Sequence, residues 1–168
     1  MTPEHWKKFV NLNSLIGREF TVPEEMDLSE VGADFEVLSE DQSIDEAKNY
    51  WPGIGVFLDG FIPVAGCSIG SGDPYFININ DGENGPLYRV YHDQVNDSGY
   101  DRNIAVDVIL ENYQSLLDYA CYYSVWSQDR NGNNTELFNG LLLEVAKKQV
   151  AELKLKKDRK KYWHDQSD

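Results

Sequence analysis

Three short segments carry residue types that could do chemistry. The first is the pair His92-Asp93, in which the carboxylate could orient the imidazole as a general base. No Cys–His arrangement accompanies the pair, and its position at the end of a strand favours a structural hydrogen bond. We therefore predict that the chain has no catalytic residue and is not an enzyme.

The second segment is the glycine-rich run from Gly66 to Asp73, which resembles a phosphate-binding loop. It lacks the Gly-Lys-Ser/Thr ending of such a loop, and a strand follows it where a helix N-terminus would hold the anion. Glycines also permit positive φ angles in a tight connection, which accounts for them without a ligand. We predict no bound nucleotide or other cofactor.

The third segment begins with Asp129-x-Asn131-x-Asn133, as an EF-hand loop does. Its sixth position should be glycine but is Asn134, and its twelfth should be glutamate but is Gly140. Turn chemistry and solvation account for the carboxylates that flank the central hairpin, and no Cys/His spacing suits zinc. We predict no metal site.

Charge is distributed unevenly along the chain. The whole chain has a net charge of −14, made up of −18 over residues 1–146 and +4 over residues 147–168. Ten carboxylates and no basic residue lie between Glu24 and Glu46. Such a body repels nucleic acids and anionic membranes and attracts basic partners, although an acidic surface also serves solubility.

The remaining composition indicates the class of protein. A length of 168 residues is that of one ordinary domain, and no apolar run approaches the roughly 20 residues of a transmembrane helix. The N-terminus turns polar too early for a secretory signal. Cys67 and Cys121 lie in apolar or small-residue segments, which favours free thiols in a reducing compartment. The predicted location is the cytoplasm.

The first half of the chain has a mixed pattern. A helical rhythm begins at Trp6 and ends at Gly17, and the acidic stretch 21–49 reads as short helical turns around a strand at Phe35–Leu38. Residues 56–58 and 61–65 flank Asp59-Gly60, which predicts a bent pair of strands.

The second half has clearer signals. Tyr75–Ile79 and Leu87–Tyr91 alternate across a turn-rich connection, which predicts an antiparallel hairpin. Apolar spacing predicts a helix near 105–120 that covers the sheet, and a charged C-terminal helix at about 135–163. The predicted fold class is α+β, with a twisted antiparallel or mixed sheet and flanking N- and C-terminal helices.

The segment Phe61–Tyr119 resembles the SUKH superfamily, which contains many bacterial toxin-immunity proteins and the fungal cell-wall-assembly regulators. Several features match in order along the chain: Ile62-Pro63-Val64-Ala65, Gly72-Asp73, the strands Tyr75–Ile79 and Pro86–Tyr91, His92-Asp93, and the helix expected around Ile104–Leu117.

The resemblance implies one α+β domain over residues 1–168, with no catalytic residues. For many bacterial members it implies neutralisation of a nuclease or another toxin domain by direct binding. A basic toxin domain would complement the acidic body. A regulatory or scaffold module of the same fold is the alternative, followed by an enzyme or a small-ligand binder.

We predict a partner surface formed by the acidic stretch and the hairpin turn, with tyrosines near the hairpin as anchors. Its residues are Glu24, Glu25, Asp27, Glu30, Asp81, Glu83, Tyr88 and Tyr91.

Overall fold

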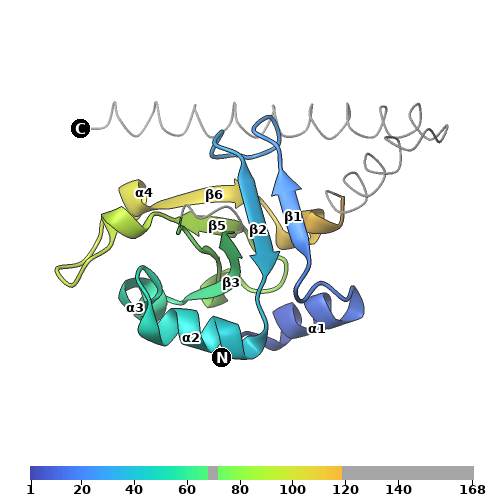
Figure 1. Ribbon diagram of the computed structural model, residues 1–168, viewed down its shortest axis with the longest axis horizontal. Helices are drawn as coiled ribbons and strands as arrows, with labels where there is room; N and C mark the ends of the chain where they lie inside the picture. Colours follow the sequence, from blue (N-terminus) through green and yellow to red (C-terminus); the bar gives the residue numbers. More distant parts are fainter. Residues whose placement is uncertain (68–71, 119–168) are drawn as a thin grey trace.

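The computed structural model describes residues 1–67 and 72–118 of this chain (Figure 1). Its elements are α1 (Glu4–Leu12), β1 (Glu19–Val22), β2 (Ala33–Val37), α2 (Glu40–Asn49), α3 (Gly53–Val56), η1 (Phe57–Asp59), β3 (Phe61–Cys67), β4 (Tyr75–Asn78), η2 (Ile79–Asp81), β5 (Leu87–Val90), η3 (His92–Gln94), α4 (Arg102–Ala105), β6 (Val106–Leu110) and η4 (Tyr113–Ser115).

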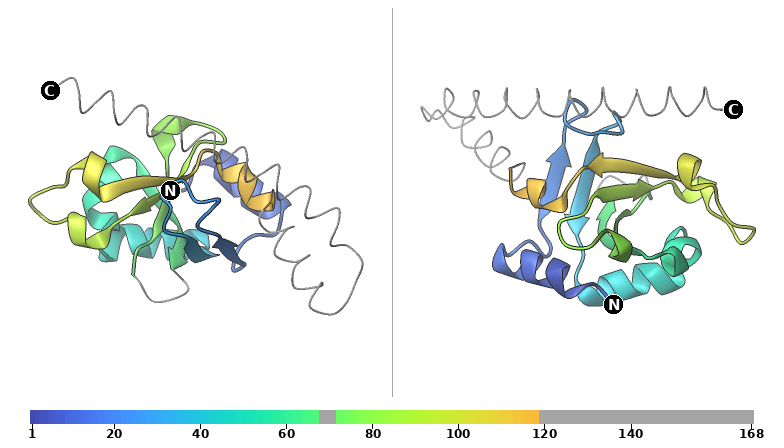
Figure 2. Two further views of the ribbon diagram at one scale, coloured as in Figure 1. Left: turned by 90° about the horizontal axis from the view of Figure 1, so that it is seen from above. Right: turned by 180° about the vertical axis from the view of Figure 1, so that it is seen from behind.

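The strands form one antiparallel meander. Their order in the sheet is β1-β2-β3-β4-β5-β6, so every strand pairs with its neighbours in sequence. Successive connections therefore start at alternate ends of the sheet, and the β5–β6 connection folds back over the outer face to reach α3 and η1. The β1–β2 loop (23–32) lies at one end, which we call the loop end, and α2, α3 and η2 lie at the other (Figures 1 and 2).

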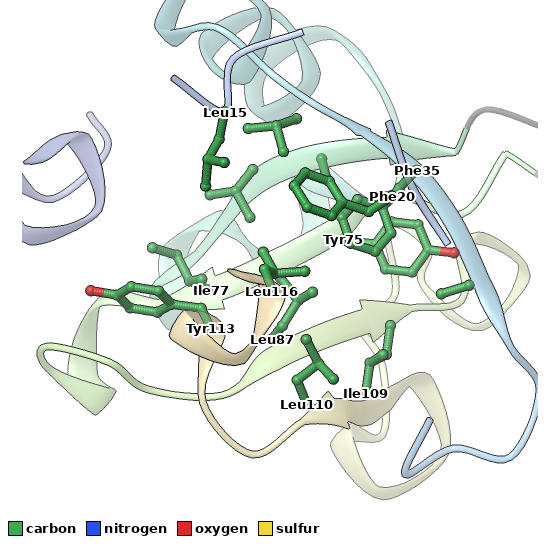
Figure 3. Close-up of a cluster of buried hydrophobic side chains, with 14 of the residues drawn as sticks. Leu15, Phe20, Phe35, Tyr75, Ile77, Leu87, Ile109, Leu110, Tyr113 and Leu116 are labelled. Carbon is green, nitrogen blue, oxygen red and sulfur yellow. The ribbon is translucent and has the colours of Figure 1, made fainter. Parts of the chain in front are cut away.

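The sheet curls, and the β1–β2 loop reaches across to edge strand β6. The backbone N–H of Leu28, in the β1–β2 loop, donates to the carbonyl of Ile109 in edge strand β6 at 3.0 Å. The curled sheet encloses the larger of two apolar clusters, in which Phe35, Tyr75 and Tyr113 are fully buried (Figure 3).

A second apolar cluster covers the outer face of the sheet. It contains Phe61, Phe76 and Tyr88, together with Val56 from α3 and Val95 from the β5–β6 connection. Because neighbouring residues of a strand point to opposite faces, Tyr75 joins the inner cluster and Phe76 the outer one. Strands β4 and β5 are consequently buried on both faces.

The α+β class and the central hairpin are confirmed. Strands β4 and β5 pair antiparallel, with Tyr75 opposite Arg89 and Phe76 opposite Tyr88. The predicted N-terminal helix is α1, and the predicted strand near Phe35 is β2. Ser39 starts α2 through a capping box with Gln42.

Two predicted elements are wrong. Over its described residues 105–118, the helix expected near 105–120 is replaced by β6, η4 and a helical turn at 116–118, because pairing with β5 decides the structure of Val106–Leu110. This segment also alternates and is rich in β-branched residues, so its sequence was compatible with a strand. Residues 56–58, expected in a strand, are the helical turns of α3 and η1.

The predicted C-terminal helix at about 135–163, the segment Asp129–Gly140 and Cys121 lie outside the described residues.

Candidate partner-binding surfaces

The loop end presents carboxylates to solvent. Glu24, Glu25 and Glu30 are exposed on the β1–β2 loop, as the prediction of a partner surface requires. Asp27, predicted as a fourth member, is fully buried at 0% exposure. It therefore cannot contact a partner directly, and this part of the predicted site is wrong.

Asp27 instead organises the loop from inside. Its Oδ1 accepts hydrogen bonds from the backbone N–H and the Oγ of Ser29, at 2.7 and 2.6 Å. The N–H of Asp27 donates to the carbonyl of Pro23, and its own carbonyl accepts from the N–H of Glu30, both at 3.0 Å. Glu30 is in the left-handed region at φ 65°, which reverses the chain.

Arg89 ties this loop to the sheet. The side chain is 4% exposed, and its Nη2 donates to the carbonyl of Gly32 and to the Tyr75 hydroxyl. The guanidinium carbon lies 5.4 Å from the centre of the Tyr75 ring and 6.0 Å from that of Tyr91. Burial alone lowers the pKa of Arg89, but its hydrogen bond with Tyr75 and the charge of Asp27 raise it, and the net direction is upward.

A cavity of about 570 Å³ opens beside this cluster, between the β1–β2 loop and strands β4 and β5. Arg89, Tyr75 and Tyr91 line it together with the carboxylates of Glu24, Asp34 and Asp73. Its mixed charges select no ligand class, and two of the acidic groups have internal partners. Asp34 accepts from the Thr21 hydroxyl, and Asp73 accepts from His92.

The hydrogen-bond partner of His92 is Asp73. The backbone N–H and the Nδ1 of His92 lie 2.9 and 2.6 Å from the Asp73 Oδ1. This contact joins the start of β4 to the end of β5, and it is the strand-end hydrogen bond that the sequence favours for this histidine.

The other predicted residues divide between exposed acids and covered tyrosines. Asp81 and Glu83 are exposed in the β4–β5 connection, at the opposite end of the sheet from the β1–β2 loop. Tyr88 is only 6% exposed, so its predicted role as an exposed anchor is wrong. Its hydroxyl donates to the Asp81 Oδ2 at 2.6 Å, and burial together with this carboxylate raises the pKa of Tyr88.

Tyr91 is half-buried, with its hydroxyl donating to the Asp107 Oδ2 at 2.9 Å. Burial, and then this hydrogen bond, raises the pKa of Tyr91. Because its ring also lies over Arg89, Tyr91 belongs to the internal cluster of the loop end.

An exposed apolar surface was missed by the sequence-based prediction. We call it the Trp51 surface, and it consists of Tyr50, Trp51, Ile54, Phe57, Leu58 and Ile79. Leu58 is 92% exposed. The signal in the sequence was the helical spacing of these residues between 50 and 58, which the interpretation of 56–58 as a strand obscured.

Glycines shape the Trp51 surface. A Cβ atom on Gly55 would lie 2.7 Å from the Trp51 ring and 2.4 Å from the Val95 side chain, so only glycine lets both pack there. Gly60, at φ +90°, turns the chain into β3, and a Cβ on it would lie 3.0 Å from Ile79. The surface therefore continues from η1 to η2.

In the comparisons with known proteins, no family model, no curated protein and no solved structure matches this chain.

In the part of the chain that the structure describes, no helix combines the length and the apolar character that crossing a bilayer requires. The His, Cys, Asp and Glu side chains of the same residues form no group of three or more that could hold a metal ion.

Proposed function

We propose that this protein binds a cationic protein and neutralises it by direct contact, as an immunity protein does with a toxin domain. One observation carries the proposal. At the loop end the basic side chain Arg89 is buried, whereas the carboxylates of Glu24, Glu25 and Glu30 are exposed. The β1–β2 loop therefore offers solvent three acids and no cation.

The internal hydrogen bonds of this loop fix the positions of its exposed carboxylates. A partner approaching a fixed set of carboxylates gains electrostatic attraction without ordering the loop first. Such steering raises association rates from about 10⁵–10⁶ M⁻¹s⁻¹ to as much as 10⁸–10⁹ M⁻¹s⁻¹ at low salt. Steering acts at a distance, over a screening length of about 8 Å at physiological ionic strength.

The resemblance to the SUKH superfamily supports the choice of a toxin as the partner. The matching segment Ile62–Ala65 and the β4–β5 hairpin lie in the central sheet, and Gly72-Asp73 lies just before β4. The segment expected to be the family's helix is β6, so the support comes from the sheet alone. In this proposal the protein acts in the cytoplasm and binds no nucleic acid.

Gene neighbourhood and co-expression test the proposal. We expect a gene for a secreted toxin with a basic C-terminal domain next to the gene for this protein. Expression of that domain should stop bacterial growth, and co-expression of this protein should restore it. If the domain kills equally with and without this protein, the immunity role is wrong. A neighbourhood of cell-wall or regulatory genes, with no toxin, would instead favour the regulatory module.

The electrostatic part of the proposal has its own measurement. Stopped-flow association of the purified toxin domain should slow steeply as sodium chloride rises from low to physiological concentration. An association rate that ignores salt would make the acidic body a solubility device.

A further inference from the structure

We infer that the Trp51 surface is the anchoring site for the partner, and that it receives an apolar side-chain cluster framed by lysines or arginines. This inference rests on the proposal that the partner is a cationic protein. It adds the place of contact and the chemistry of the segment that fills it.

The Trp51 surface presents apolar side chains on one face. Ile54, Phe57 and Leu58 stand at positions i, i+3 and i+4 of the turns α3 and η1, so they share one face. Trp51 extends that face, since its ring lies against Gly55 next to Val95. Exposed apolar side chains that share one face in this way are typical of an interaction site, and aromatic residues are common anchors in protein interfaces.

Carboxylates held by hydrogen bonds border the Trp51 surface. Asp59 directly follows Leu58 and accepts a hydrogen bond from the Tyr100 hydroxyl. Burial and this carboxylate raise the pKa of Tyr100 to about 12. Asp81, two residues after Ile79, accepts from Tyr88 in the same way. The tyrosines hold both carboxylates at the edge of the apolar face.

The border continues along the β5–β6 connection. Asp97 lies two residues after Val95, which contacts Gly55, and Asp101 follows Tyr100. In η1 and the β4–β5 and β5–β6 connections, all within the described residues, Arg102 is the one Lys or Arg side chain, and Asp59, Asp81, Asp97 and Asp101 are among six carboxylates. A second copy of this chain would bring the same acidic border and another net charge of −14, which opposes self-association. A cationic partner fits both features.

Two synthetic peptides of equal length and charge test the inference. One arranges Leu and Lys as an amphipathic helix, and the other has Ser in place of every Leu. We expect the Leu/Lys peptide to bind the wild-type protein more tightly by about tenfold or more, because burial of one leucine is worth roughly that factor. Fluorescence polarisation with labelled peptides gives both affinities.

Matched variants locate the contact. Leu58→Ser should remove most of the difference in affinity between the two peptides, whereas Leu12→Ser should preserve this difference. Leu12 is 74% exposed on α1, outside the Trp51 surface, so it controls for loss of one exposed leucine. Neither change alters the net charge, and thermal melting checks that both variants are folded. If Leu58→Ser and Leu12→Ser show the same ratio of affinities for the two peptides, the inference is wrong.

The toxin domain separates this inference from the proposed function. With that domain, Leu58→Ser should raise the dissociation rate and leave the association rate unchanged. Unaltered dissociation together with full protection of growth would refute the anchoring site and leave the immunity role standing. A wild-type protein that sediments as a dimer, converted to a monomer by Leu58→Ser, would assign the Trp51 surface to a second copy and also overturn the inference.

Discussion

The loop end and the Trp51 surface differ in which side chains they bury. At the loop end, two ionisable residues, Asp27 and Arg89, are almost completely enclosed. At the Trp51 surface, large apolar side chains such as Trp51 and Leu58 are left in contact with solvent. Each region thus reverses the usual placement of polar and apolar residues.

The two reversals have different physical consequences. Burying Asp27 and Arg89 costs desolvation energy, which internal hydrogen bonds offset only in part, because no group in the described part of the chain donates to the Asp27 Oδ2. The result is a fixed loop that displays other carboxylates. An exposed apolar face contributes favourable free energy only when a partner covers it and removes it from water. We therefore expect charges to govern how fast a partner arrives, and the apolar face to govern how long it stays.

The largest expected contrast lies between two phenylalanines. Phe76 is fully buried in the outer cluster, whereas Phe57 is 37% exposed on the Trp51 surface. Phe76→Ala should lower the free energy of unfolding by about 3–5 kcal/mol, because it leaves a cavity. Phe57→Ala should cost less than about 1 kcal/mol. Urea unfolding measures both, and equal losses would show that the Trp51 surface is part of the structural core.

At the loop end, the corresponding change is Arg89→Met. It should cost about 3 kcal/mol, because it removes the hydrogen bonds to Gly32 and Tyr75 and leaves Asp27 without its neighbouring cation. Adding Asp27→Asn to this variant should recover part of the loss, and the double variant serves as the control. A loss below about 0.5 kcal/mol, the range of ordinary surface changes, would mean that Arg89 does not hold the loop.

Charge removal compares the two regions kinetically. Changing Asp81, Asp97 and Asp101 to Asn should slow association with the cationic partner about tenfold at low salt, since these acids border the anchoring site. Changing Glu24, Glu25 and Glu30 to Gln should slow it only about threefold, since the loop end acts from farther away. Both triple variants lose the same charge. A larger effect of the loop variant would place the contact at the loop end.

The smallest effect concerns Glu40, a carboxylate that is partly exposed and fully partnered, unlike Asp27. Burial raises its pKa, but hydrogen bonds from the N-terminal ammonium and Thr2 outweigh burial and lower it to about 2. Because the folded pKa lies below the ordinary glutamate pKa of 4.5, the stabilisation is present above pH 4.5 and is lost between about pH 4.5 and 2. Relative to Glu40→Gln, the wild type should lose urea resistance over this acidic interval. If the urea midpoints of the two proteins fall in parallel as the pH is lowered, Glu40 does not have the lowered pKa.

Several features could be predicted from sequence because local patterns decide them. The alternation of Tyr75–Ile79 and Leu87–Tyr91 across a glycine-containing turn predicted the hairpin, and the structure confirms it. The α+β class followed from the same patterns. The acids Glu24, Glu25, Glu30, Asp81 and Glu83 lie on the surface as expected, because solvation favours carboxylates there.

Other features were decided by contacts between residues distant in the chain. Val106–Leu110 has both helical and alternating spacing, and pairing with β5 makes it a strand. Asp27 is enclosed because the loop folds back onto Ile109 and Arg89, whereas Tyr88 is covered by Phe61 at a ring distance of 5.4 Å. Composition alone cannot tell a buried charge from an exposed one. That depends on which groups the fold brings within hydrogen-bonding distance, and the same fold decides which apolar side chains of α3 and η1 remain uncovered.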